Sequence, residues 1–127
     1  MVTQTTNGIT ISAEASYQPE HSRPLAHKHV FSYRIRIDNH GLDTVQLLRR
    51  HWHIVDSNGV VREVEGEGVV GAQPVLLPSE SYQYTSWCPL MTEMGKMYGT
   101  FLMEKEDGST FYARIPEFKL IAPQKLS

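Results

Sequence analysis

Two histidine pairs have the spacing that metal chelation requires. His27 and His29 form one H-x-H, and His51 and His53 form another. If each pair lies within a strand, alternation puts both imidazoles on one face, where together they could chelate an ion. Imidazole suits cobalt, nickel, copper or zinc, and suits magnesium poorly. The competing interpretation is that these are solvated strand and loop histidines, because nothing in the sequence shows the pairs meeting.

A glycine-rich stretch, GEGVVG, matches the G-x-G-x-x-G fingerprint of dinucleotide-binding turns. That fingerprint works by presenting a pyrophosphate to the N-terminus of a following helix. A helix beginning near Val69 would contain Pro74 and Pro78, and an interior proline costs about 3 kcal/mol. We therefore expect a turn that links strands. The alternative is an anion-binding nest of backbone N–H groups, formed by Gly66, Gly68, Val69, Val70 and Gly71.

Weaker candidates are an acidic row, a methionine series and two nucleophiles: Glu63, Glu65 and Glu67; Met91, Met94 and Met97; and Ser86 and Cys88. If their strand continues, the carboxylates share one face. There they could hold a hard cation, or they could form only a solvent-exposed strand face. The methionine spacing favours packing over soft-metal binding. Neither nucleophile lies in a nucleophile elbow. We therefore expect no catalytic residues and no cofactor.

Bulk properties narrow the class of protein. The 127 residues fit one domain, and a net charge of -2 gives no strong signal for nucleic-acid binding. A single cysteine excludes an internal disulfide, and the first residues, MVTQTTNG, lack the basic and apolar segments of an export signal. No apolar run approaches the length of a membrane span. We expect a cytoplasmic protein without membrane insertion.

The elements that must position these residues are strands, because apolar residues recur with a period of two almost everywhere. Phe31, Tyr33, Ile35 and Ile37 show this most clearly. Seven strands are expected, at 9–17, 29–40, 45–55, 60–65, 81–87, 96–104 and 110–115, with an extended tail at 117–122. This pattern predicts an all-β sandwich, immunoglobulin-like or fibronectin type III-like, with a small closed barrel as the alternative. We expect one domain over 1–127 with an ordered core of roughly 7–122.

The last two strands form a predicted hairpin around Asp107-Gly108. A two-residue turn would set Met103 opposite Tyr112, whereas a three-residue loop would set Met103 opposite Ala113. Only the second register gathers the apolar residues of both strands on one face. We therefore predict the three-residue loop and the Met103–Ala113 pairing.

Several ordered blocks resemble the ApaG family: GEGVVGAQPVLLP, YTSWCPL and TEMGKMYGTF, with RHWHIVDSNG upstream and IPEFKL downstream. The sequence departs from the family pattern at Ser79 and Trp87, where glycine is expected. The resemblance implies an immunoglobulin-like or fibronectin-like sandwich. It also implies a link to cobalt and magnesium homeostasis, a discussed affinity for nucleotide or pyrophosphate, and, through eukaryotic relatives, a role in protein interaction. It carries over no catalytic residue.

Two functions follow as hypotheses. The preferred one is a non-catalytic binding module that meets an unknown protein partner through loops and a sheet face bearing Trp87 and Tyr98, because exposed aromatic residues anchor interfaces. The alternative is a small-ligand sensor that binds a phosphate compound or a divalent cation. Both leave a homo-oligomer open.

Overall fold

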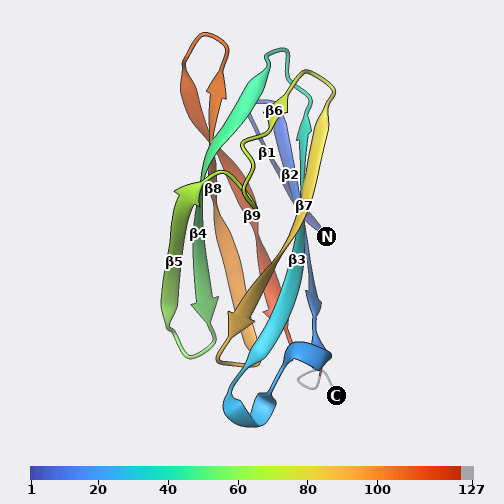
Figure 1. Ribbon diagram of the computed structural model, residues 1–127, viewed down its shortest axis with the longest axis vertical. Helices are drawn as coiled ribbons and strands as arrows, with labels where there is room; N and C mark the ends of the chain where they lie inside the picture. The colour runs from blue at the N-terminus through green and yellow to red at the C-terminus, as the bar shows by residue number, and fades with distance from the viewer. Residues whose placement is uncertain (124–127) are drawn as a thin grey trace.

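The protein is a sandwich of two antiparallel sheets, seen in a computed structural model that describes residues 1–123 (Figure 1). Residues 124–127 of the predicted domain lie outside the described residues. One sheet has the order β1 (Val2–Thr6), β2 (Ile9–Tyr17), β3 (His29–Asn39), β7 (Ser81–Leu90). The other has the order β5 (Val61–Glu67), β4 (Val45–Asp56), β8 (Met94–Lys105), β9 (Thr110–Ile121), with β6 (Val75–Leu76) paired to β4.

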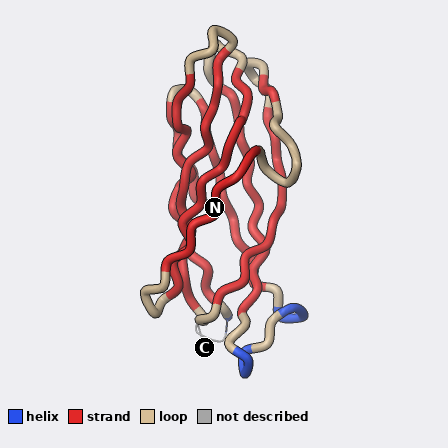
Figure 2. Tube along the Cα trace, turned by 60° about the vertical axis from the view of Figure 1, so that its left-hand side comes forward, coloured by secondary structure: helices blue, strands red, loops and turns tan. Residues whose placement is uncertain are grey.

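Two single-turn 3-10 helices, η1 (Pro19–His21) and η2 (Pro24–Ala26), lie between β2 and β3 at one end of the molecule (Figure 2). No helix among residues 1–123 is both long and apolar enough to cross a membrane. The predicted all-β class is confirmed, and the two sheets are consistent with the immunoglobulin-like or fibronectin-like arrangement.

The core between the sheets follows the predicted alternation. Tyr33, Trp52 and Phe118 meet at its centre, with ring centroids 5.4 to 5.9 Å apart. The seven predicted strands correspond to β2–β5 and β7–β9, and β9 continues through Pro116 into the segment predicted as a tail. The additional strands are β6, of two residues, and β1, whose sequence VTQTT has too few apolar residues for the pattern to detect.

A β-bulge in β4 decides which side chains of that strand face the core. The pairing with β8 runs from Leu47–Met103 to Arg49–Leu102 and skips Leu48. Before the bulge the odd-numbered Leu47 is buried, and after it the even-numbered Trp52 is buried. An extra residue in one strand reverses the alternation in this way.

The β8–β9 hairpin has the predicted loop length but a different register, so the Met103–Ala113 prediction is wrong. Met103 pairs with Phe111 and Phe101 with Ala113. The loop is Glu106–Gly108, one position earlier than expected, because Gly108 supplies the positive φ at its end. Met103 and Phe101 therefore each pair two residues earlier along β9 than predicted. A shift of two residues keeps the same apolar face turned inward, with Met103 and Ala113 fully buried.

Ser79 has a glycine-like backbone at a position where the resemblance predicts glycine. Its φ is 76°, in the left-handed region that favours glycine. Its N–H donates to the Asn39 carbonyl oxygen at 2.8 Å, which ties the turn after β6 to the end of β3. Serine therefore occupies this turn in the backbone conformation that glycine adopts more readily.

Candidate metal-binding site and aromatic surface

His51 and His53 lie side by side on the outer face of β4, as the alternation predicts. Their ring centroids are 4.6 Å apart. They face outward because the bulge at Leu48 reverses the alternation. Without that bulge, the parity that buries Leu47 would also direct both histidines into the core.

The neighbouring strand β5 brings carboxylates to this pair. Glu63 lies across from His53, and Glu65 across from His51. Glu63 Oε1 is 2.9 Å from His51 Nε2 and 3.6 Å from His53 Nδ1. Glu65 Oε1 is 3.7 Å from His51 Nδ1. Two imidazoles and one carboxylate thus present ligand atoms that all lie within 4.8 Å of one another.

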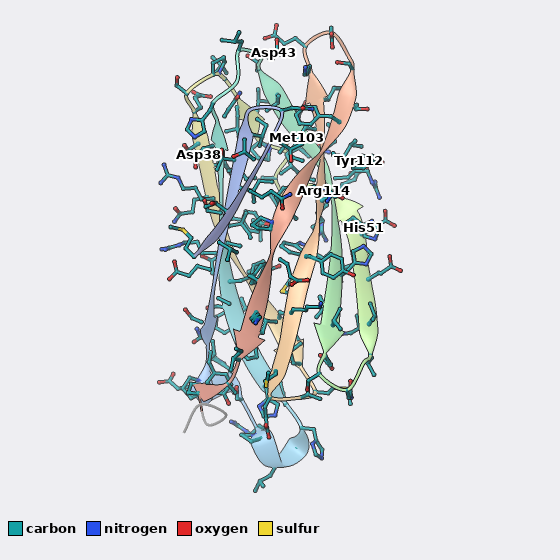
Figure 3. All side chains as sticks on the ribbon, turned by 180° about the vertical axis from the view of Figure 1, so that it is seen from behind. Asp38, Asp43, His51, Met103, Tyr112 and Arg114 are labelled. Atoms are coloured by element: carbon teal, nitrogen blue, oxygen red, sulfur yellow. The ribbon has the colours of Figure 1, made fainter. Side chains whose placement is uncertain are left out.

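The strand on the other side of β4 supports His53 and leaves the cluster open. Tyr98 of β8 stacks on the His53 ring, with centroids 4.9 Å apart and planes 13° from parallel. A groove of about 390 Å³ runs beside them, and Arg114 lines it. A second groove is lined by His51, Glu65 and Tyr112. Figure 3 labels His51, Tyr112 and Arg114 on this side of the molecule.

The other histidine pair is separated by the structure. His27 is exposed and caps η2 with φ 54°, in the left-handed region. His29 begins β3 and is only 3% exposed. Strand alternation does not extend across a residue with positive φ, so the two imidazoles do not share a face. The structure therefore brings His51 and His53 together and separates His27 from His29.

The glycine stretch forms the predicted turn between β5 and β6. Val69 and Ala72 exchange two backbone hydrogen bonds of 2.8 and 2.9 Å around Val70 and Gly71, both of which have positive φ. Such a pair of residues closes a tight turn of the primed type. The Gly68 N–H is also engaged, because it donates to the Leu48 carbonyl oxygen at 2.8 Å.

This turn and nearby side chains hold the bulge at Leu48, which precedes the histidine cluster in β4. The Leu48 carbonyl accepts hydrogen bonds from the Gly68 N–H and from the Gln73 side chain at 2.9 Å. The Arg50 guanidinium donates to the carbonyls of Glu67 and Gly68. A Cβ atom at Gly66 would lie 2.9 Å from that guanidinium. Gly68 thus has a structural role at the bulge of β4.

The two nucleophile candidates are placed in packed surroundings. Burial raises the pKa of the Cys88 thiol to about 11. Ser86 is half-buried and lies opposite Tyr33 in the β3–β7 pairing, and burial raises the pKa of Tyr33. The methionine series is divided, because Met97 is in the core while Met91 and Met94 are exposed.

Trp87 and Tyr98 belong to different sheets, so they do not form one surface. Trp87 is 51% exposed on the outer face of β7, where its ring meets His21 of η1 edge-on at 5.1 Å. Tyr98 is on β8, beside the histidine cluster. The sheet face predicted to bear both aromatics is thus two faces with different neighbours.

Glu63 is the residue whose place beside the histidines the sequence analysis missed. The turn Asp56-Ser57-Asn58-Gly59 holds the signal, because the Asp56 N–H bonds the Val60 carbonyl and sets Val55 opposite Val61. Extending that register along the hairpin places Glu63 opposite His53. Tyr98 has no such local signal, because β8 is far away in the sequence.

Comparisons with known proteins agree with the resemblance. The family model described as the ApaG domain matches residues 19–105. Protein ApaG of Paramagnetospirillum magneticum is 50% identical over 125 residues, which cover 98% of this chain and 96% of that protein. Protein ApaG of Brucella canis is 46% identical with the same coverage. A Bordetella pertussis crystal structure described as a candidate ApaA protein is 45% identical, with a TM-score of 0.88 over 91% of this chain and 94% of that one.

Proposed function

Because this chain belongs to the ApaG domain family, we propose that it is a non-catalytic binding module that acts on a protein partner. The observation that carries the proposal is Trp87, an exposed indole braced by His21. Rigid aromatic side chains of this kind supply much of the binding energy at protein interfaces. In this proposal the protein works in the cytoplasm, and the link to cobalt and magnesium homeostasis is an indirect result of partner binding.

The surroundings of Trp87 support a binding surface at this end of the sandwich. β3 begins where β7 ends, since His29 pairs with Leu90. Leu25 of η2 precedes that point, Met91 follows it, and both are exposed. We define the Trp87 surface as Trp87, His21, Leu25 and Met91. Exposed apolar side chains near a sheet end, with an aromatic anchor, fit the composition of an interface core.

The state of the nucleophile candidates supports a non-catalytic role. A cysteine nucleophile needs its thiolate at working pH, and active cysteines have lowered pKa values. The pKa of Cys88 is instead raised by burial. Ser86 is half-buried opposite Tyr33 in the β3–β7 pairing.

Affinity purification from cytoplasmic extract tests the proposal, followed by affinity measurements with the purified partner. Trp87→Ala is the informative variant, and Tyr112→Ala is the matched control, because Tyr112 is 64% exposed on the other sheet. We expect the wild type and the control to bind alike. Loss of a central aromatic anchor costs about 2 kcal/mol or more, so Trp87→Ala should bind about 30-fold more weakly. Failure to recover a reproducible partner, or full binding by Trp87→Ala, would overturn it.

The alternative function is a small-ligand sensor, and it has two candidate positions. The cluster of His51, His53 and Glu63 offers ligands for a divalent cation. The turn around Val70 and Gly71 is the candidate position for a phosphate compound. Thermal melts with ATP, pyrophosphate and divalent cations separate the two, since a ligand at 100 times its dissociation constant stabilises by about 2.7 kcal/mol.

A further inference from the structure

We propose that His51, His53 and Glu63 form a binding site for one borderline transition-metal ion of the zinc or nickel class. The proposal deepens the ligand-sensor alternative and rests on it, but it is independent of the protein-partner proposal. Two imidazole nitrogens and one carboxylate oxygen within 4.8 Å are a complete set of protein ligands for such an ion.

The distances fit an ion without rearrangement of the backbone. Metal–ligand bonds of about 2.0–2.2 Å place neighbouring ligand atoms about 3.0–3.5 Å apart. Glu63 Oε1 lies 2.9 Å from His51 Nε2 and 3.6 Å from His53 Nδ1. The third separation, between the imidazole nitrogens of His51 and His53, is within 4.8 Å, so a rotation of the His51 or Glu63 side chain is needed to close the set around an ion.

The cluster is held in place before any ion binds. β4 and β5 are joined by a continuous hairpin register through this region. The stacked Tyr98 ring limits rotation of His53. Glu65 lies beside Nδ1 of His51, whose Nε2 is the atom turned toward Glu63. A carboxylate behind a histidine orients the ring and strengthens it as a ligand.

The donor set determines which ions fit. Zinc, nickel, copper and cobalt accept imidazole nitrogen readily, whereas magnesium prefers oxygen ligands and retained water. Glu63 and Glu65 add negative charge on the same face, which favours a cation over a neutral ligand. Three protein ligands leave further coordination positions, and the grooves beside His51 and His53 keep those positions accessible to water.

A simple ion pair accounts for only part of this arrangement. A hydrogen bond between His51 and Glu63 needs neither His53 nor its stacked support. The metal site, in contrast, requires all three residues. Single substitutions therefore distinguish the two interpretations.

Calorimetric titration of untagged protein with Zn²⁺ tests the site, because a polyhistidine tag would bind the ion itself. We expect one Zn²⁺ per chain and no matching heat with Mg²⁺. His51→Ala, His53→Ala and Glu63→Gln should each weaken binding at least tenfold. His27→Ala is the matched control and should titrate as the wild type does. Glu65→Gln should weaken binding by about 10-fold, as expected for a residue that supports a metal ligand.

Nuclear magnetic resonance supplies a readout that does not depend on affinity alone. Paramagnetic Ni²⁺ should broaden the ring signals of His51 and His53 first, and leave those of His27 sharp. Circular dichroism melts check that each variant is folded. Absence of Zn²⁺ binding by folded wild type, or equal affinity in His53→Ala, would overturn the site. Either result leaves the partner proposal untouched, because the titration contains no partner.

Discussion

The two H-x-H pairs have the same spacing in the sequence and opposite positions in the structure. His51 and His53 stand together on an open sheet face, beside Glu63. His27 is exposed at the end of a 3-10 turn, and His29 is buried at the start of β3. The spacing places two side chains together only within an uninterrupted strand. The positive φ of His27 interrupts the first pair, and the bulge at Leu48 turns the second outward.

The largest expected effect comes from breaking the support beneath the second pair. Gly68→Ala would place a Cβ atom 2.3 Å from the Ala72 carbonyl oxygen, in a residue with φ 64°. Strain and displacement of the turn together should lower the free energy of unfolding by about 3 kcal/mol or more. Gly71→Ala is the control, because its positive φ costs about 1–2 kcal/mol and its Cβ would meet open space. Urea unfolding measures both, and equal losses would contradict a close-packed role for Gly68.

Cys88 is buried at the same end of the β3–β7 pair as His29. Its thiol should be unreactive, in contrast to the partly exposed cluster of His51, His53 and Glu63. Its pKa is raised by burial from 9.0 to about 11. A rise of two pKa units leaves about 100-fold less thiolate near pH 8. The native protein should therefore react with a thiol reagent at least about 100-fold more slowly than the urea-unfolded chain. Equal rates would show that the thiol is open.

The same raised pKa makes stability depend on alkaline pH. Because the folded-state pKa exceeds the unfolded value, the unfolded chain loses its thiol proton first. The protonated Cys88 thiol contributes roughly 2–3 kcal/mol to the free energy of unfolding. This contribution is fully present below about pH 9 and is lost as pH rises toward about 11. Cys88→Ala should flatten the stability curve between about pH 9 and 10, below the range where Tyr33 and Tyr84 begin to contribute. An unchanged slope would contradict this assignment.

Alanine substitutions should separate the two pairs by stability. His29→Ala empties a buried position and should cost about 1–3 kcal/mol. His53→Ala removes a partly exposed ring that stacks on Tyr98 and should cost less than about 1 kcal/mol. Urea unfolding without metal gives both values. A larger cost at His53 would reverse the comparison.

The smallest expected effect is at His27. Glycine there relieves the left-handed backbone, which costs other residues about 1–2 kcal/mol, but it also gives the unfolded chain more freedom. His27→Gly should therefore change the free energy of unfolding by no more than about 0.5 kcal/mol. His53→Gly, in the middle of a strand, is the contrasting variant. It should lower the free energy of unfolding by about 1 kcal/mol more than His27→Gly does. A marked loss in His27→Gly would show a packing role for its side chain.

Much of the fold could be predicted from local pattern, and the candidate site could be predicted only in part. The alternation of Phe31 to Ile37 sufficed for β3, and the proline pair after the glycine stretch sufficed to exclude a Rossmann helix. The β8–β9 register was missed by two residues, because both registers bury the same face. The position of Glu63 opposite His53 could have been predicted from the turn between β4 and β5. Tyr98 was not, because its contact with His53 depends on a pairing between distant strands.

The sequence by itself determined the all-β class, the turn in GEGVVG and the membership of the ApaG family, since each depends on local periodicity, steric limits or ordered motifs. Only the tertiary structure decided which histidines meet and which aromatics are apart. A single extra residue at Leu48 reverses the faces of β4, and that bulge is held by a hydrogen bond from Gly68, twenty residues later. Sheet pairing therefore decides what local spacing leaves open.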